Sequence, residues 1–162
     1  MKRTIVAITA VGLVLGVGLA ALAASPNGRT PPTCMDSLWR TTAQSTSSTQ
    51  WAPVAGFSDD PVAIYPIAIN VSAEVSGSPV DFRIQSTNVG VQTFISKAGA
   101  TRFVPDGSGP DSFAYQWIEK NQSAATHSIH LELQWKSSDG GTVTLERGDM
   151  SVLYTTDACK GA

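Results

Sequence analysis

The sequence predicts an all-β protein, an antiparallel β-sandwich preceded by a secretory signal. One observation is the segment 127–136, which alternates apolar and polar residues with the period of two that is typical of a half-buried strand. Another is the recurrence of such segments between turns rich in Gly, Ser, Pro and Asp, a rhythm that indicates about eight to ten strands. The third is that no helical period follows the N-terminal apolar segment.

The segment 127–136 shows the clearest alternation. One row should face the core and the other solvent, because neighbouring side chains of a strand point to opposite faces. The apolar row contains Ile129, Leu131, Leu133 and Trp135, and the polar row contains His130, Glu132, Gln134 and Lys136.

The N-terminus has the three parts of a bacterial-type secretory signal. Lys2 and Arg3 precede an uncharged apolar stretch over 4–22, and Ala21-Leu22-Ala23 supplies small residues for cleavage. We therefore interpret 1–24 as a signal peptide; an uncleaved membrane anchor is the alternative. Residues 25–50, rich in Ser, Thr and Pro, are predicted to be a loop or linker, with a short turn at 35–40, and 51–162 to be the β-domain.

Composition disfavours several classes of partner. Of the 11 Lys and Arg, 9 lie beyond Lys2 and Arg3, against 13 Asp and Glu, which leaves the mature chain a net charge of −4. These charges are spread without a basic block, so neither nucleic acid nor an anionic membrane surface is an expected partner. Cys34 and Cys159 flank the predicted domain, and two lone cysteines in an exported chain most simply form a disulfide.

Two turns are predicted to close hairpins. The alternating run 67–75 is followed by Ser76-Gly77-Ser78-Pro79 and by the shorter run 80–84. Residues 137–141 should similarly join the strand at 127–136 to the next one. Further strands are expected at 89–95, 99–103 and 113–120, and two separate strands are expected around Val143–Leu145 and Met150–Tyr154.

The C-terminal half resembles the TNF/C1q-like jelly roll. The residues that carry this resemblance are HSIHLELQWKS at 127–137, GGTVTLERG at 140–148 and DMSVLYTTD at 149–157. The resemblance implies a jelly-roll sandwich with adjacent termini, no catalysis and a homotrimer built around an aromatic-rich face. Unlike the collagen-associated members, this chain has no Gly-X-Y stalk. Immunoglobulin-like and carbohydrate-binding sandwiches would show a similar rhythm.

Aromatic residues have two interpretations. Trp135 and most of the row Phe113, Tyr115 and Trp117 fit the core, whereas exposed rings could stack on sugars or form an interface. The candidate ligand or interface aromatics are Trp51, Tyr65, Tyr115 and Trp117.

The sequence contains few residues that suggest catalysis or metal binding. Asp106 and Asp111 are spaced somewhat like calcium ligands, but a polar turn explains them as well. His127 and His130 should face opposite sides of a strand, which disfavours a shared metal site. Ser112 with a histidine, or Glu132 with Glu146, could be drawn as catalytic sets, without a supporting motif.

Arg147-Gly148-Asp149 is an RGD tripeptide, which would bind an integrin only at an exposed loop tip and otherwise marks a strand junction. The sequence thus predicts a secreted, extracytoplasmic, non-catalytic β-sandwich that needs no cofactor and binds a protein or serves cell-surface structure. A carbohydrate-binding module and a small secreted hydrolase are the alternatives.

Overall fold

The computed structural model describes residues 32–88, 92–95, 99–119, 127–156 and 159. Within these ranges the chain forms ten antiparallel strands, which confirms the all-β prediction. No helix in the described ranges is long and apolar enough to cross a membrane. The predicted signal segment lies outside them. The strands are β1 (Thr33–Arg40), β2 (Gln44–Thr46), β3 (Ala52–Asp59), β4 (Val62–Gly77), β5 (Val80–Asn88), β6 (Gln92–Ile95), β7 (Thr101–Phe103), β8 (Asp111–Glu119), β9 (His127–Ser137) and β10 (Val143–Thr155).

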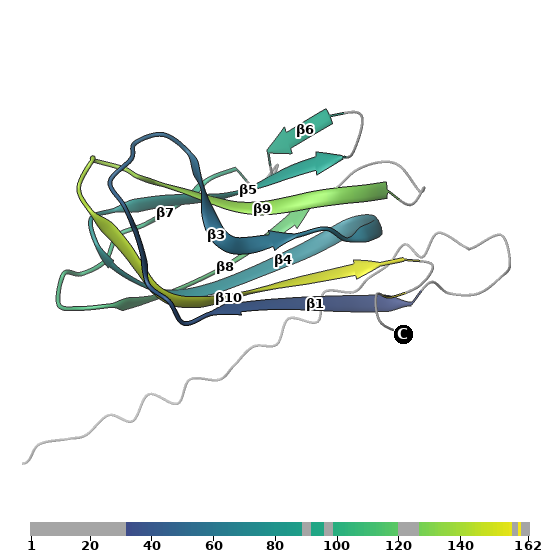
Figure 1. The fold of residues 1–162 in the computed structure, drawn as a ribbon, viewed down its shortest axis with the longest axis horizontal. Coiled ribbons are helices and arrows are strands. Elements are labelled where there is room, and N and C mark those ends of the chain that lie inside the picture. The colour runs from purple at the N-terminus through teal and green to yellow at the C-terminus, as the bar shows by residue number, and fades with distance from the viewer. Residues whose placement is uncertain (1–31, 89–91, 96–98, 120–126, 157–158, 160–162) are drawn as a thin grey trace, which may run out of the picture.

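The strands form two facing layers (Figure 1). We call sheet I the layer with the order β1-β10-β4-β8, in which β2 also pairs with β10. Sheet II has the order β3-β9-β5, with β6 and β7 both paired to β5. The two layers join where Val62 and Ala63 of β4 pair with the start of β9.

The pairings are nested along the chain. β1 pairs with β10, β3 with β9, β4 with β8, and β5 with β6 and β7. This is the pattern of one long hairpin rolled up, and rolling adds the lateral pairs β4–β10 and β5–β9. Two antiparallel layers connected in this way make a jelly roll.

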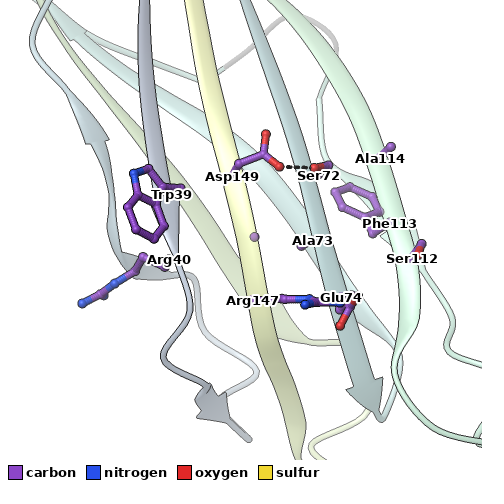
Figure 2. A pocket seen from close by; sticks show the side chains of 11 residues that line it. Trp39, Arg40, Ser72, Ala73, Glu74, Ser112, Phe113, Ala114, Arg147 and Asp149 are labelled. Carbon is purple, nitrogen blue, oxygen red and sulfur yellow. Dashed lines mark hydrogen bonds and ion pairs between the residues drawn. The ribbon is translucent and has the colours of Figure 1, made fainter.

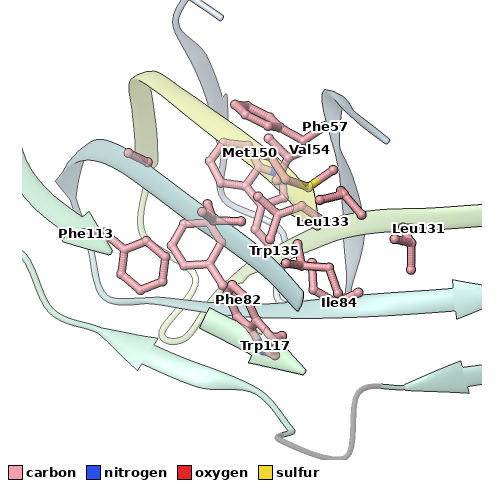
Figure 3. Packing of buried hydrophobic residues seen from close by; sticks show 14 of the residues in the cluster. Val54, Phe57, Phe82, Ile84, Phe113, Trp117, Leu131, Leu133, Trp135 and Met150 are labelled. Carbon is pink, nitrogen blue, oxygen red and sulfur yellow. The ribbon is translucent and has the colours of Figure 1, made fainter. Parts of the chain in front are cut away.

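The core lies between the layers (Figure 3). The apolar row of β9 is buried as predicted, with Ile129, Leu131 and Leu133 at 0% exposure and Trp135 at 4%. Phe82 of sheet II stacks on Phe113 of sheet I, with ring centroids 4.7 Å apart. Side chains from both layers therefore fill one continuous core.

The two predicted hairpins are wrong. β4 belongs to sheet I and β5 to sheet II, and the same holds for β10 and β9. Each turn is instead a corner that takes the chain from one layer to the other. The two corners lie against each other, because the Ser78 amide donates to the Thr142 carbonyl at 2.9 Å and the Ser138 amide to the Pro79 carbonyl at 2.8 Å.

The sheet also begins earlier than predicted. Thr33–Arg40 is not a docked turn but strand β1, and Gln44–Thr46 is strand β2, both paired with β10. Cross-strand pairing thus gives extended structure to the Ser- and Thr-rich part that the sequence predicts as a linker. β-propensity is dominated by such context.

β10 is one strand rather than two. Its buried positions change from odd numbers, at Val143 and Leu145, to even numbers, at Met150, Val152 and Tyr154. A register shift between Leu145 and Arg147 against β4 accounts for this change. An extra residue in one strand reverses which side chains face inward.

Cys34 and Cys159 form a disulfide whose Cα atoms lie 5.6 Å apart. The bond closes a sequence separation of 125 residues, so it restricts the unfolded chain strongly. We expect replacement of both cysteines by serine to lower the free energy of unfolding by about 4 kcal/mol. Urea denaturation at neutral pH measures this, and an unchanged midpoint would contradict it.

Gly77 begins the first corner with φ +92°, and a Cβ there would lie 2.3 Å from the Thr142 carbonyl oxygen. Gly107 has a similar φ of +82° but open space around it. Both Ala variants should incur the cost of a left-handed residue. We expect Gly77→Ala to lower the free energy of unfolding by about 1–3 kcal/mol more than Gly107→Ala does, because only the methyl group at Gly77 would clash with a neighbouring backbone atom. Equal losses in urea denaturation would show that the corners are not packed as described.

Candidate functional site

The outer face of sheet I carries a large exposed aromatic residue. Trp39 of β1 is 75% exposed and lies in register with Asp149 of β10. Asp149 pairs in turn with Ser72 of β4, and Ser72 with Ala114 of β8. Directly opposite residues share a face, so this row crosses the whole sheet.

The surface along this row is hollowed (Figure 2). One hollow of about 370 Å³ lies beside Trp39 and Arg147, and a second of about 360 Å³ lies beside Asn70 and Gln116. Ser72, Ala114 and Asp149 line both hollows, which makes them one open trough. We call it the sheet I trough and define it by Trp39, Asn70, Ser72, Glu74, Ala114, Gln116, Arg147 and Asp149.

Hydrogen bonds hold the polar side chains of the trough. Arg147 pairs with Glu74, and the Ser72 hydroxyl donates to Asp149. The Gln116 amide donates to Asn70 Oδ1 at 2.7 Å. The hydrogen bond that Arg147 donates to the Glu74 carboxylate raises the pKa of Arg147 above its ordinary value. Arg40, although it borders the hollow, donates its guanidinium to the Ala55 carbonyl of β3.

The RGD tripeptide lies inside the sheet rather than at a loop tip. Gly148 pairs with Arg40 on one side and with Ala73 on the other. A Cβ at Gly148 would lie 2.8 Å from the Ser72 carbonyl oxygen, so the close approach of β4 and β10 explains the glycine. Neither the loop-tip interpretation nor the strand-junction interpretation describes this position.

Of the predicted aromatic candidates, Trp117 belongs to the core. It is 0% exposed and donates its indole N–H to the Gly99 carbonyl at 3.1 Å. Tyr115, on the same edge strand, is 38% exposed and packs against Trp117 with centroids 4.7 Å apart. The side chain of Tyr65 lies outside the described residues.

Trp51 is half-buried and covered by cations. Arg83 Cζ lies 4.2 Å from its ring centroid, and Lys136 Nζ lies 5.1 Å away. Cation–π contacts of this kind occupy the face that a sugar or a partner would use. Trp39 offers that face to solvent, and the sequence prediction missed it because 25–50 was expected to be a linker. The sequence feature that could have revealed Trp39 is the alternation over 33–40, which places Met35, Ser37 and Trp39 on one face of a strand.

The residues weighed for metal binding or catalysis are held by local contacts. Asp111 accepts from the Asp106 amide at 2.5 Å, and Asp106 accepts from the Ser108 amide and hydroxyl at 2.7 and 2.6 Å. These bonds from Ser108 lower the pKa of Asp106. The described part of the chain contains no group of three or more His, Cys, Asp or Glu side chains that could hold a metal.

The residues of the proposed catalytic sets are dispersed. His130 Nδ1 lies 2.7 Å from Asp60 Oδ1, whereas Ser112 lies on β8 of the other sheet. Glu132 bonds to Gln134 on sheet II, and Glu146 bonds to Ser76 on sheet I, so they do not face each other. The side chain of His127 lies outside the described residues.

Comparisons with known proteins support the fold alone. No protein-family model matches the chain, and no curated protein matches it significantly. The structure of infectious bursal disease virus Gx strain matches with a TM-score of 0.51 and 14% identity over 78% of this chain. This chain spans 33% of that viral chain. At this identity the likeness supports the fold and says nothing of function.

Two further solved structures are similar over most of their length. The Eiger TNF from S. frugiperda matches with a TM-score of 0.41 and 11% identity, over 82% of this chain and 98% of that one. A protein of disulfide-linked Bacillus endospore appendage pili matches with a TM-score of 0.40 and 12% identity, over 83% and 97%.

The outer face of sheet II carries a cross-strand row of charges, Lys136–Asp81–Arg102. Asp81 is buried at 7% exposure and accepts from Arg102 at 2.8 and 3.3 Å, with Lys136 Nζ at 3.7 Å. The Arg102 hydrogen bond lowers the pKa of Asp81, although burial opposes this. Because the pKa of Asp81 is lower in the folded protein than in the unfolded chain, its carboxylate stabilises the fold at pH values above the unfolded pKa. This stabilisation is lost as pH falls through the folded pKa.

We expect Asp81→Asn to lower the free energy of unfolding at pH 7 by about 1–2 kcal/mol, because a hydrogen-bonded charge is lost. The deficit should shrink as pH falls from the ordinary pKa of an aspartate toward the lowered pKa of folded Asp81, and it should vanish once wild-type Asp81 is itself protonated. Arg102→Gln should remove most of this dependence of the free energy of unfolding on pH in the acid range, because the Arg102 hydrogen bond is the main cause of the lowered pKa of Asp81. Urea denaturation from pH 2 to 7 measures both variants, and a deficit that stays constant with pH would contradict the assignment.

Proposed function

We propose that this chain is an exported, non-catalytic β-sandwich module that acts by binding a protein partner or by building cell-surface structure. The observation that carries the proposal is an apolar row on the outer face of sheet I. Met35, Leu153, Ala68 and Ile118 lie in register across β1, β10, β4 and β8. Met35 is 66% exposed.

Such a row is unusual for a solvated sheet face. Antiparallel sheets with one face in water place polar residues on that face. The neighbouring row, Ser37, Ser151, Asn70 and Gln116, follows this rule. A rigid sheet that presents apolar side chains at one end is suited to contact with another protein.

The disulfide supports an oxidising location. Such bonds persist in secreted and periplasmic proteins and are rare in the cytosol. Together with the predicted signal peptide, this supports a secreted or cell-surface protein. The dispersal of His130, Ser112, Glu132 and Glu146 makes the hydrolase alternative less favourable.

The partner at the apolar row is either a foreign surface protein or further copies of this chain, with a homotrimer as the expected assembly. Light scattering of residues 25–162 distinguishes these two forms. A mass of three chains that falls to one in Met35→Ser/Leu153→Ser identifies self-association through the row. A mass of one chain, with the wild type held at the producing cell's surface and the variant released, identifies a foreign partner.

Ser37→Ala, an exposed change on the same strand, serves as the matched control and should behave as the wild type. The proposal is contradicted if Met35→Ser/Leu153→Ser changes neither the mass nor the retention at the cell surface.

A further inference from the structure

We propose that the sheet I trough is a binding site for a neutral oligosaccharide, with Trp39 as its stacking platform. This site lies beside the apolar row and goes beyond the proposed function. Figure 2 shows the exposed indole of Trp39 with the Ser72 hydroxyl and the Asp149 carboxylate at one hollow of the trough. The amides of Asn70 and Gln116 line the adjoining hollow. These are the groups that match the two kinds of surface on a sugar ring.

The indole matches the apolar side of the ring. An aromatic face carries negative charge density and attracts the slightly positive C–H groups of a pyranose. Trp39 is 75% exposed, and its place on a paired strand fixes the backbone that carries it. Trp51 is half-buried and has two cations over its ring, so it is less open to a sugar than Trp39.

The polar side chains match the hydroxyl groups. A sugar hydroxyl both donates and accepts, so it is best met by groups that together do both. Asn70 and Gln116 offer amide donors and acceptors, Ser72 a hydroxyl, and Asp149 a carboxylate. Their mutual hydrogen bonds orient them before a ligand arrives, which reduces the entropy lost on binding.

The charges of the trough favour a neutral ligand. Glu74 and Asp149 are its acidic groups and Arg147 its cation, and Arg147 is paired with Glu74. Arg40 also borders the hollow, and its guanidinium donates to the Ala55 carbonyl of β3. The two acidic groups and two cations balance, and both cations are already hydrogen-bonded, so the site favours a neutral ligand over phosphate or sulfate groups.

The shape favours a chain of sugars over a single one. The row from Trp39 to Ala114 crosses four strands, roughly 14 Å at the usual strand spacing. Both hollows open to solvent along this line, so a polymer can pass through without threading its end. An apolar small molecule is less suited to these hollows, because such ligands are held in enclosed pockets that bury most of their surface, and both hollows are open.

Affinity electrophoresis of residues 25–162 tests the site, in gels that contain hydroxyethyl cellulose, xylan, galactomannan or glycol chitin, with heparin as the anionic comparison. We expect at least one neutral polysaccharide to retard the wild type and heparin to leave it unaffected. Trp39→Ala should weaken binding about tenfold or more, as loss of a stacking platform does. Asn70→Ala should also weaken binding.

Trp51→Ala is the matched control, because it removes an indole that packs on Arg83 and Lys136 of sheet II, away from the trough, and should leave binding unchanged. Retention of the urea midpoint in Trp39→Ala shows that the variant is folded, since this side chain is mostly solvated. The inference is overturned if no neutral polysaccharide retards the protein, if heparin binds more strongly, or if the two tryptophan variants behave alike. These outcomes leave the apolar row untouched, so this site and the proposed function fail separately.

Discussion

The structure depends on the antiparallel pairing of β10 with β1 and β4. β10 is a central strand of sheet I, and its partners come from the first half of the described chain. Pairings of such long sequence separation lose much loop entropy before they gain contacts. The Cys34–Cys159 disulfide lowers this entropy cost, because it links the chain where Cys34 of β1 lies directly opposite Tyr154 of β10. The pairs β3–β9, β4–β8 and β5–β7 are nested inside the β1–β10 pair.

This arrangement also creates the two outer faces of the sandwich. On sheet II, charged and amide side chains satisfy one another across strands, and the cations Arg83 and Lys136 cover Trp51. On sheet I, an apolar row and an exposed indole remain available to a partner. The two outer faces thus differ: polar groups on sheet II pair with one another, whereas sheet I exposes Met35 and Trp39 to solvent.

The sequence predicted the burial pattern well and the strand neighbours poorly, for one physical reason. Alternation says which side chains face the core, and it held for Leu131 and Leu133 of β9. Alternation does not say whether the next strand pairs within the same sheet or belongs to the facing sheet. Ile69 and Phe82 would be buried in either arrangement. The corner at Gly77, which has the composition of a hairpin turn, therefore suggested a pair that does not form.

The candidate site was harder to predict than the fold. Trp39 stands among Ser, Thr and Pro residues, and only pairing with β10 makes its segment a strand. Trp51 and Trp117 were reasonable candidates by residue type, but exposure and cation contacts depend on neighbours far along the chain. By contrast, the change of the apolar positions in β10 from odd to even residue numbers was visible in the sequence. It could have indicated the register shift between Leu145 and Arg147.

The strand neighbours are tested most directly by backbone nuclear Overhauser effects in the isotope-labelled mature protein. The structure predicts cross-strand contacts of Ser151 with both Ser37 and Asn70, and of Ala73 with Gly148. A ladder of backbone contacts that instead pairs Ala73 with Phe82 would restore the hairpin between β4 and β5. That result would contradict the jelly roll and, with it, both surfaces proposed on sheet I.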